Sequence, residues 1–387
     1  MIRLLTILSF CLLPLSLLAQ PDSSHLRISL LTVSPGEQIY ASFGHTGIRI
    51  TDSSNGTDVV FNYGTFDGYD KDFEKKFIRG KLLYYSSSDQ FRDFISTYVY
   101  ERRTVQEQEL FLSGPQKVAL YDFLIENAKP ENRYYKYDFL YDNCATRIRD
   151  VFPRTFGQGF TFGNTLPAGP QLTFRNIINH YLRGIHWERF GINLLLGSSV
   201  DKVMSNKDIM FLPDYLRDGI GNATVNGRKI ATAPVAILNM PPVPEPGTDV
   251  PMLVTLGVLG LTILGLSIPQ LKPLGILMST TLLVISGLLG CLILFMWLGT
   301  DHQACQSNFN ILWALPTNVL VPFLRRKGRD RYALVAISLL LLSLVLHLFH
   351  VQELPLKELW PLLLALLYIF GMIYKRNRHN HKPYAAG

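Results

Sequence analysis

Apolar segments dominate the second half of the chain and limit the folds open to it. They cover about residues 251–268, 274–299, 311–324, 331–349 and 357–374. About 20 consecutive apolar residues cross a bilayer as a helix, so the first, second, fourth and fifth segments are long enough, or nearly so. The third is short and contains Pro316 and Pro322, so it is either a tilted span or a re-entrant segment. The sequence predicts an all-α transmembrane bundle of about five helices.

Basic residues gather at two places in this half of the chain. They group between the third and fourth segments and in the tail after the fifth: Arg325, Arg326, Lys327, Arg329, Arg331, Lys375, Arg376, Arg378 and Lys382. These two groups account for the formal net charge of +7, so the charge reports membrane orientation and a nucleic-acid surface is not indicated. Five crossings put both groups on the cytoplasmic side, whereas a re-entrant third segment would put one of them outside.

The N-terminus, residues 1–20, is typical of a secretory signal peptide. Arg3 precedes an apolar run that is short for a membrane span and is interrupted by Pro14. An uncleaved anchor is the alternative, but the sequence favours cleavage. Cys11 lacks the small residue that normally precedes a lipidated cysteine, so lipid attachment is not expected. The chain is expected in a bacterial inner membrane with its first domain exported to the periplasm.

The exported domain is expected to span residues 21–240, which have an ordinary globular composition rich in aromatics. Residues 241–250 are Pro-rich and predict a stiff linker. The transmembrane domain then covers 251–374, and a basic cytoplasmic tail covers 375–387.

Within the exported domain the predicted secondary structure is mixed, so the fold class is α+β. Strands are predicted over 26–33, 47–51 and 59–63, with a turn at 52–56. Helical spacing appears at 73–77, 91–98, 116–128 and 143–152, and the stretch 134–140 is aromatic and extended. Pro153 is expected to end the last of these helices.

Cys144 is the strongest candidate for chemistry. It follows Asp142 and Asn143, either of which can cap a helix, so it falls in a first helical turn. Backbone N–H groups and the helix dipole favour a thiolate there, and Arg147 and Arg149 add positive charge. The thiolate is the nucleophilic form of cysteine, so this position suits covalent catalysis. The alternative is a small buried apolar residue, and the local sequence does not decide between the two.

A cysteine nucleophile needs a base, and His45 offers one. It begins a predicted strand between two nearby glycines, which leave room around the ring. If the turn at 52–56 closes a hairpin, Asn62 lies beside His45 on the same face and can orient the imidazole. A one-residue slip would place Tyr63 there instead. A lone histidine is more often a structural residue, and that alternative stays open.

The other histidines and cysteines give weaker signals. His180 and His186 are six residues apart, a spacing that does not suit zinc binding on one helix face. The sequence contains no zinc-ligand cluster, Gly-rich phosphate loop or Gly-x-Ser-x-Gly elbow, so neither a metal nor a cofactor is expected. Cys144 and Cys305 are both expected on the oxidising side, where they could form a disulfide.

One polar cluster lies between the second and third apolar segments. It contains Asp301, His302, Asn308 and Asn310. The five-crossing topology puts this cluster on the outer face, next to the exported domain. Polar groups at helix ends are usually only solvated, and a docking or substrate role is the alternative.

Five stretches together resemble one known family. They are residues 34–49 around His45, 61–66, 79–84, 137–147 around Cys144, and 301–313 in the membrane half. In this order they resemble the Bacteroidetes lipoprotein N-acyltransferase (Lnb) family over most of the chain. The order of histidine before cysteine also resembles circularly permuted papain-like folds, such as the NlpC/P60 and lecithin–retinol acyltransferase groups.

The resemblance implies a permuted papain-like domain in which Cys144 is the nucleophile and His45 the base. It implies that an acyl chain moves from a phospholipid to Cys144, and then to the α-amine of the lipidated N-terminal cysteine of a lipoprotein. The match does not settle the third catalytic residue. Two other functions stay open: a membrane-tethered cysteine amidase or peptidase acting on cell wall, and a non-catalytic envelope sensor or assembly protein.

Overall fold

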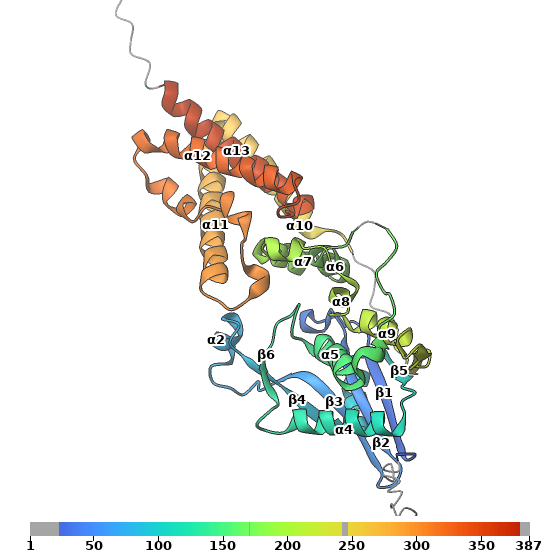
Figure 1. The fold of residues 1–387 in the computed structure, drawn as a ribbon. Helices are drawn as coiled ribbons and strands as arrows, with labels where there is room; N and C mark the ends of the chain where they lie inside the picture. The colour runs from blue at the N-terminus through green and yellow to red at the C-terminus, as the bar shows by residue number, and fades with distance from the viewer. Residues whose placement is uncertain (1–22, 170, 242–246, 380–387) are drawn as a thin grey trace, which may run out of the picture.

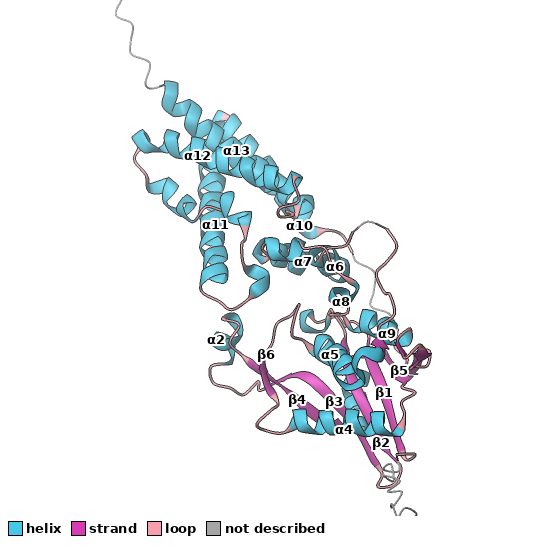
Figure 2. Ribbon diagram, in the orientation of Figure 1, coloured by secondary structure: helices cyan, strands magenta, loops and turns pink. Residues whose placement is uncertain are grey.

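The computed structural model of the chain describes residues 23–169, 171–241 and 247–379. An α/β domain with an antiparallel sheet is followed by a helical domain (Figures 1 and 2), as the sequence predicts. The predicted signal peptide, the centre of the linker and the end of the basic tail lie outside the described residues.

Seven strands form one antiparallel sheet in the order β10-β5-β1-β2-β3-β4-β6. Their bounds are Leu26–Val33 (β1), His45–Asp52 (β2), Thr57–Phe66 (β3), Leu83–Gln90 (β4), Val105–Glu109 (β5), Tyr134–Lys136 (β6) and Val235–Leu238 (β10). The three predicted strands are present as β1, β2 and β3. A second sheet contains β7 (Phe160–Thr161), β8 (Thr224–Val225) and β9 (Arg228–Lys229).

The turn between β2 and β3 sets the register that positions the candidate histidine. A carboxylate oxygen of Asp52 accepts a hydrogen bond from the N–H of Ser54 (2.8 Å), and Gly56 has a φ of +76°, which glycine adopts without strain. This turn pairs Gly47 with Asn62. Since side chains alternate across a strand, this register decides which residues of β3 share a face with those of β2.

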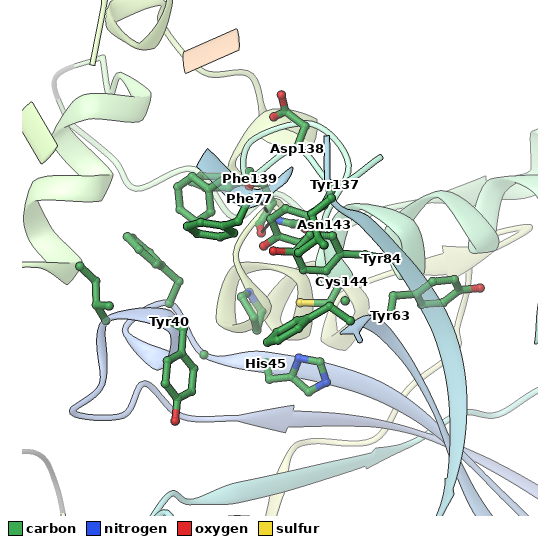
Figure 3. Close-up of a pocket in the computed structure, with 18 of the residues that line it drawn as sticks. Tyr40, His45, Tyr63, Phe77, Tyr84, Tyr137, Asp138, Phe139, Asn143 and Cys144 are labelled. Atoms are coloured by element: carbon green, nitrogen blue, oxygen red, sulfur yellow. Dashed lines mark hydrogen bonds between the residues drawn. The ribbon is translucent and has the colours of Figure 1, made fainter. Parts of the chain in front are cut away.

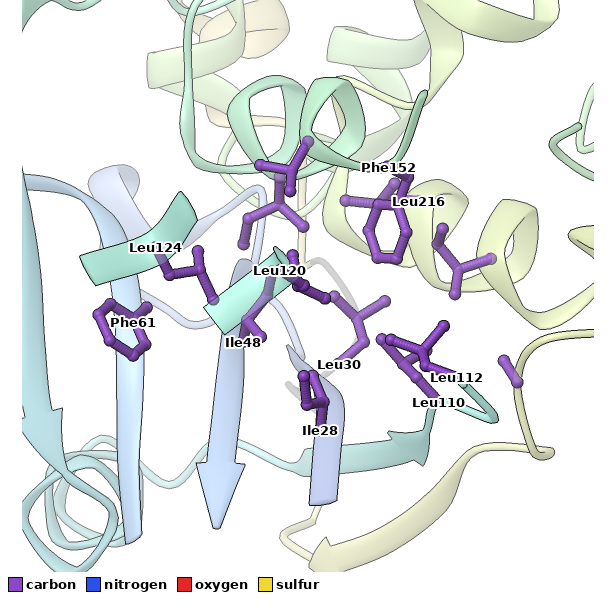
Figure 4. Packing of buried hydrophobic residues seen from close by; sticks show 14 of the residues in the cluster. Ile28, Leu30, Ile48, Phe61, Leu110, Leu112, Leu120, Leu124, Phe152 and Leu216 are labelled. Carbon is purple, nitrogen blue, oxygen red and sulfur yellow. The ribbon is translucent and has the colours of Figure 1, made fainter. Parts of the chain in front are cut away.

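Helices cover both faces of the large sheet. On one face, α4 (Gly114–Ala128), α5 (Cys144–Phe156) and α9 (Pro213–Gly221) pack on a core that includes Ile28, Leu30, Ile48 and Phe61 (Figure 4). On the other face, α3 (Phe91–Tyr100) contributes Phe94 and Tyr98 to a smaller core with Leu31, Val33 and Val60. Burial of this apolar surface holds the helices on the sheet.

The predicted helices are all present, and one continues beyond its expected end. α2 spans Phe73–Ile78, and α3 and α4 lie at the other predicted positions. The prediction that Pro153 ends α5 is wrong, because this helix continues to Phe156 and ends at Gly157, which has a φ of +65°. Pro153 removes one N–H donor from the last helical turn, and the helix continues past it.

A small helical unit connects the α/β domain to the membrane helices (Figure 1). It contains α6 (Phe174–Tyr181), α7 (His186–Leu195), a 3₁₀ turn η3 (Ser198–Asp201) and α8 (Asn206–Ile209). Arg175 is fully buried in this unit, where it bonds to Asp201 (2.6 Å) and to the carbonyl of Gly197 (2.8 Å). A buried charge needs such partners, so the pair fixes α6 against η3.

Four described helices are long and apolar enough to cross a membrane. They are α10 (Val250–Ser267), α11 (Lys272–Leu298), α12 (Arg326–Leu348) and α13 (Leu356–His379). The third predicted segment is not α-helical, because it forms the 3₁₀ turns η6 (Phe309–Leu312) and η7 (Pro316–Phe323). It lies against α11, where a Cβ atom on Gly290 would meet the carbonyl of Ala314 at 1.9 Å. Glycines in α11 therefore let the two backbones touch.

The helix ends show how the third segment runs. Three segments of the membrane domain bond to α6 or α7. Asp249, at the start of α10, pairs with Arg189 (3.4 Å), Asn310 in η6 donates to the carbonyl of Leu194 (3.1 Å), and Glu353, between α12 and α13, accepts from Asn176 (3.3 Å). Residues 309–324 begin at this end of the bundle, and α12, which follows them, ends there. The segment therefore crosses to the opposite end of the bundle before α12 begins, which agrees with five crossings and not with a re-entrant loop.

Candidate active site

A cavity of about 490 Å³ lies where the end of the sheet meets the membrane domain. Cys144 at the start of α5 and His45 at the start of β2 both line it, and Figure 3 shows their side chains facing the same space. Much of the wall is aromatic, with Phe43, Phe66, Phe77, Tyr84, Tyr137 and Phe139. Residues 301–304, directly after α11, close one side. The cavity thus joins both candidate catalytic residues to the end of a membrane helix.

Asn143 fixes the start of the helix that carries Cys144. Its Oδ1 accepts a hydrogen bond from the N–H of Thr146 (2.9 Å), so Asn143 is the helix cap. Its Nδ2 donates to the carbonyls of Phe139 (2.8 Å) and Phe211 (2.9 Å). Because this side chain is buried and uses both ends of its amide, it holds the helix terminus, and with it the sulfur, in one place.

Burial dominates the ionisation of Cys144. It raises the pKa of the thiol to about 11, while the N–H groups of Thr46, Ala145 and Cys144 and the charge of Arg103 oppose the shift. The predicted thiolate is therefore wrong for this structure: the N–H groups are in place, but desolvation outweighs them. The thiol is protonated at neutral pH and needs a base. Because the N–H of Thr46 acts on the sulfur, the sulfur lies beside the start of β2, where Thr46 directly follows His45.

The two arginines predicted to assist the thiol are engaged elsewhere. Arg147 forms an ion pair with Asp142 (2.6 Å) and lies over the ring of Tyr135 (3.4 Å). Arg149 forms an ion pair with Asp150 (2.9 Å). Neither arginine lines the cavity. Asp142 thus stabilises the loop before α5 through Arg147 and does not cap the helix.

A polar relay holds the ring of His45. Nε2 of His45 lies 3.1 Å from Oδ1 of Asn62, and Nδ2 of Asn62 donates to a carboxylate oxygen of Asp89 (2.8 Å). Since a carboxylate only accepts hydrogen bonds, Asp89 fixes which end of the amide faces His45. Asn62 therefore accepts from the imidazole, which puts the proton on Nε2 and leaves Nδ1 free to act as a base.

The observed hairpin register is the one that places Asn62 beside His45. The slipped register with Tyr63 in that place does not occur. Tyr63 is buried on the opposite face of β3, where burial raises its pKa to about 12. Burial also lowers the pKa of His45 to about 4, although the hydrogen bond to Asn62 opposes the shift. His45 is therefore a neutral imidazole at neutral pH, the form that can accept a proton.

Arg103 is a charged cavity residue that the sequence analysis missed. Its side chain is only 5% exposed, forms an ion pair with Glu101 (2.8 Å), and lies 5.0 Å from the ring centre of Tyr98. Its charge lowers the pKa of both Cys144 and His45. No local pattern marks this arginine, since only the pairing of distant strands brings it to the cavity.

The polar cluster after α11 divides into two pairs. Asp301 and His302 line the cavity, and His302 Nε2 lies 3.1 Å from the carbonyl of Ile78. Asn308 and Asn310 are fully buried and donate to the carbonyl of Leu194 in α7 at 2.9 Å and 3.1 Å. The first pair therefore belongs to the candidate site, and the second pair docks the membrane domain on the helical unit.

The remaining candidates do not form a second site. Cys144, Cys291 and Cys305 are free, so the predicted alternative of a Cys144–Cys305 disulfide does not occur in the described chain. His186 lies 3.9 Å from Asp249, near the linker. The described residues contain no group of three or more His, Cys, Asp or Glu side chains that could hold a metal.

Two family models match the chain. The Lnb N-terminal periplasmic domain matches residues 16–180, and the Lnb transmembrane domain matches residues 245–380. The chain belongs to the Lnb family. This confirms the family to which the sequence motifs point. No curated protein and no solved structure matches the chain.

The family match assigns each half of the chain to a compartment. The first half is a periplasmic domain, and the second is a multi-pass membrane domain. The periplasmic match of this Lnb protein includes His45 and Cys144, whereas residues 301–304 belong to the membrane match. Both Lnb domains therefore contribute to one cavity.

Proposed function

We propose that the chain is a lipoprotein N-acyltransferase with Cys144 as its nucleophile and His45 as its base. Membership of the Lnb family suggests lipoprotein N-acylation. The observation that carries the proposal is the cavity, in which a thiol and an imidazole share an aromatic-lined space with the end of a membrane helix. Such a space suits the acyl chain of a lipid that arrives from the bilayer.

In the first half-reaction, the sulfur of Cys144 attacks the ester carbonyl carbon of a phospholipid. Nδ1 of His45 takes the thiol proton during the attack, which the raised pKa of the thiol makes necessary. The tetrahedral intermediate then breaks its C–O bond to the glycerol, and His45 returns the proton to the leaving oxygen. A lysophospholipid leaves, and the acyl chain remains on Cys144 as a thioester.

In the second half-reaction, the free α-amine of a lipoprotein's lipidated N-terminal cysteine attacks the thioester carbon. His45 accepts a proton from the amine, the C–S bond breaks, and the proton passes to the departing sulfur. The product is an amide, and Cys144 is again a thiol. Asn62 and Asp89 hold the imidazole in the tautomer that both steps need. The reaction needs no cofactor.

The proposed substrates suggest how the chain sits in the cell. We assign residues 21–240 to the catalytic domain in the periplasm, 241–250 to a linker, 251–374 to the transmembrane domain of the inner membrane, and 375–387 to the cytoplasmic tail. Both substrates are lipid-anchored. Tethering the catalytic domain at their bilayer therefore confines the search to a surface and raises the effective concentration of each substrate.

Mass spectrometry of the full chain in lipid nanodiscs tests the proposal. With phospholipid alone, the peptide that contains Cys144 should carry an acyl thioester, and added diacyl lipopeptide should become a triacyl amide. Cys144→Ser should reduce the rate of amide formation by about 10⁴-fold or more, whereas Cys291→Ser, a matched change at an exposed thiol of α11, should not.

Two outcomes would overturn it. Undiminished amide formation by Cys144→Ser would exclude the thioester. Release of cell-wall fragments from added peptidoglycan, with no lipopeptide amide, would show an amidase instead.

A further inference from the structure

α2 and the five residues after it form an exposed surface between the cavity and the membrane domain, which we call the α2 rim (residues 73–83). No residue of α2 is buried, and Phe77 and Ile78 at its end are each 51% exposed. Leu83, at the start of β4, is exposed as well. Exposed apolar side chains that gather into one patch are typical of surfaces that bind a protein or a membrane.

Three contacts fix the α2 rim to the segment that follows α11. The N–H of Asp301 donates to the carbonyl of Arg79 (2.9 Å), and His302 Nε2 lies 3.1 Å from the carbonyl of Ile78 and 3.2 Å from that of Phe77. α11 has 27 residues, so it is about 40 Å long, whereas a bilayer core is about 30 Å thick. The end of α11, and the α2 rim with it, therefore reaches the level of the lipid headgroups.

The charges of this segment are distributed unevenly. The acidic residues come first in the sequence, with Lys71 among them: Asp67, Asp70, Asp72 and Glu74. The basic residues follow towards α11: Lys75, Lys76, Arg79 and Lys81. Lys76 pairs with Asp70 (2.5 Å), but the structure records no ion pair for Lys75, Arg79 or Lys81 within the described residues, and all three are exposed. The basic end thus lies where lipid phosphates are found.

Aromatic rings connect the α2 rim to the interior of the cavity. Phe77 stacks with Phe73 (6.0 Å between ring centres), and Phe73 contacts Phe66 (5.4 Å). Phe66 contacts Tyr84 (5.5 Å), which stacks with Tyr137 (4.4 Å). Four of these rings also line the cavity that holds Cys144. An apolar chain that enters at the rim therefore meets apolar surface along the whole path.

We propose that the α2 rim is a binding surface for anionic phospholipid. Phe77 and Ile78 enter the bilayer among the acyl chains, and Lys75, Arg79 and Lys81 bind the anionic headgroup. One acyl chain of the bound lipid then follows the aromatic rings towards Cys144. Only this last step rests on the proposed function, because binding of the lipid requires no acyl transfer.

Photocrosslinking tests the position of the α2 rim. The photoreactive residue p-benzoylphenylalanine is placed at Ile78, the last residue of α2, and as a control at Tyr69, which is 99% exposed in the loop before α2. The full chain, with Cys144→Ser in both cases, is held in nanodiscs of phosphatidylethanolamine and phosphatidylglycerol. We expect phospholipid adducts at position 78 and few at position 69. The absence of adducts at 78, or equal yields at both positions, would overturn the proposal without bearing on catalysis.

The ratio of the two lipids among the adducts at position 78 tests the role of the charges. One basic side chain near an anionic surface contributes about 1 kcal/mol, or about fivefold in binding. We therefore expect phosphatidylglycerol to be enriched about fivefold or more over its share of the nanodisc. The double variant Arg79→Gln, Lys81→Gln should lose most of this enrichment, because Lys75 alone remains.

The matched double variant Lys71→Gln, Arg92→Gln removes the same two charge types from exposed sites outside the α2 rim, and it should keep the enrichment. A lipid ratio equal to that of the nanodisc in the parent chain, or equal losses in both double variants, would refute binding of the headgroup by the rim.

Discussion

The two halves of the molecule bury the same kinds of polar side chain and use them differently. In the periplasmic domain, Asn62 is buried between His45 and Asp89, beside a cavity. In the membrane domain, Asn308 and Asn310 are buried as well, but they bond to backbone carbonyls of α7. The first arrangement leaves a ring nitrogen free for chemistry, whereas the second leaves nothing free and fixes two helical units together.

The cysteines repeat this difference. Burial raises the pKa of Cys144 and of Cys305 to about 11 in each case. Three N–H groups and Arg103 oppose the shift at Cys144, while at Cys305 burial acts alone. Burial by itself therefore does not mark a nucleophile. What distinguishes Cys144 is the set of N–H groups and the positive charge of Arg103 that stabilise its thiolate form. Substitutions in both halves of the molecule can test this distinction.

After the loss of the Cys144 thiol itself, the largest effect is expected at His45. His45→Ala removes the base that a protonated thiol needs, so the rate of acyl-enzyme formation should fall by about 10²- to 10⁴-fold. His302→Ala removes a histidine from the same cavity whose Nε2 bonds only to backbone carbonyls of α2, and it should cost about tenfold or less. Both rates are measured from thioester accumulation on Cys144 in nanodiscs. Equal losses in the two variants would remove the distinction between a base and a docking residue.

The next largest effect is expected in the relay behind His45. Asn62→Ala leaves Nε2 without an acceptor and should lower the rate by about 10- to 100-fold, as loss of an orienting group usually does. Asp89→Ala should act in the same direction, because the amide of Asn62 is then free to turn. The double variant should lose little more than Asn62→Ala alone, since both changes break one chain of hydrogen bonds.

Asp93→Ala is the control for the relay, because Asp93 is an exposed carboxylate on α3 near Asn62. It should leave the rate of thioester formation unchanged. Additive losses in the Asn62 and Asp89 variants would mean that Asp89 does not act through Asn62.

The contact between His45 and Asn62 could be predicted from the sequence, whereas the positions of Asp89 and Arg103 could not. The turn at 52–56 fixes the pairing of β2 with β3, so the contact between Asn62 and His45 follows from local pattern. Asp89 lies on β4, which pairs with β3 through an irregular register, and no local signal gives that register. Arg103 depends on still more distant pairings, because β5 lies between β1 and β10 in the sheet.

In the membrane half, too, the sequence predicts local features but not the contacts between distant elements. Hydropathy and charge predict five crossings, because both patterns are local. The close packing of η7 on glycines of α11 and the docking of Asn308 and Asn310 on α7 both depend on where distant elements lie, which no local pattern gives. Sequence therefore predicts the elements and the nearest contacts, whereas contacts between distant elements come only from the fold.

Asn310→Ala should affect stability more than chemistry. Oδ1 of Asn310 accepts the hydrogen bond of Trp313 Nε1 (2.9 Å), and its removal leaves a buried donor without a partner, at a cost of about 1–3 kcal/mol. The melting temperature of the full chain in nanodiscs should fall, while acyl transfer at low temperature should change by less than it does in Asn62→Ala. Gln306→Ala, an exposed change in the same loop, is the control. A rate loss as large as that of Asn62→Ala, without a lower melting temperature, would give Asn310 a direct role in catalysis.

The smallest effect is expected at Cys305, and it separates burial from reactivity. Cys305 behaves as a small apolar residue, so Cys305→Ala should change the rate of acyl transfer by less than about twofold. Because Cys144 and Cys305 are both free, a reductant should also leave the rate unchanged in the parent chain and in the variant. If Cys305→Ala instead raised the rate, and a reductant raised the rate of the parent chain to the same level, a disulfide with Cys144 would be controlling the enzyme. The two cysteines would then form one redox pair, and the contrast between the two halves would fail at this point.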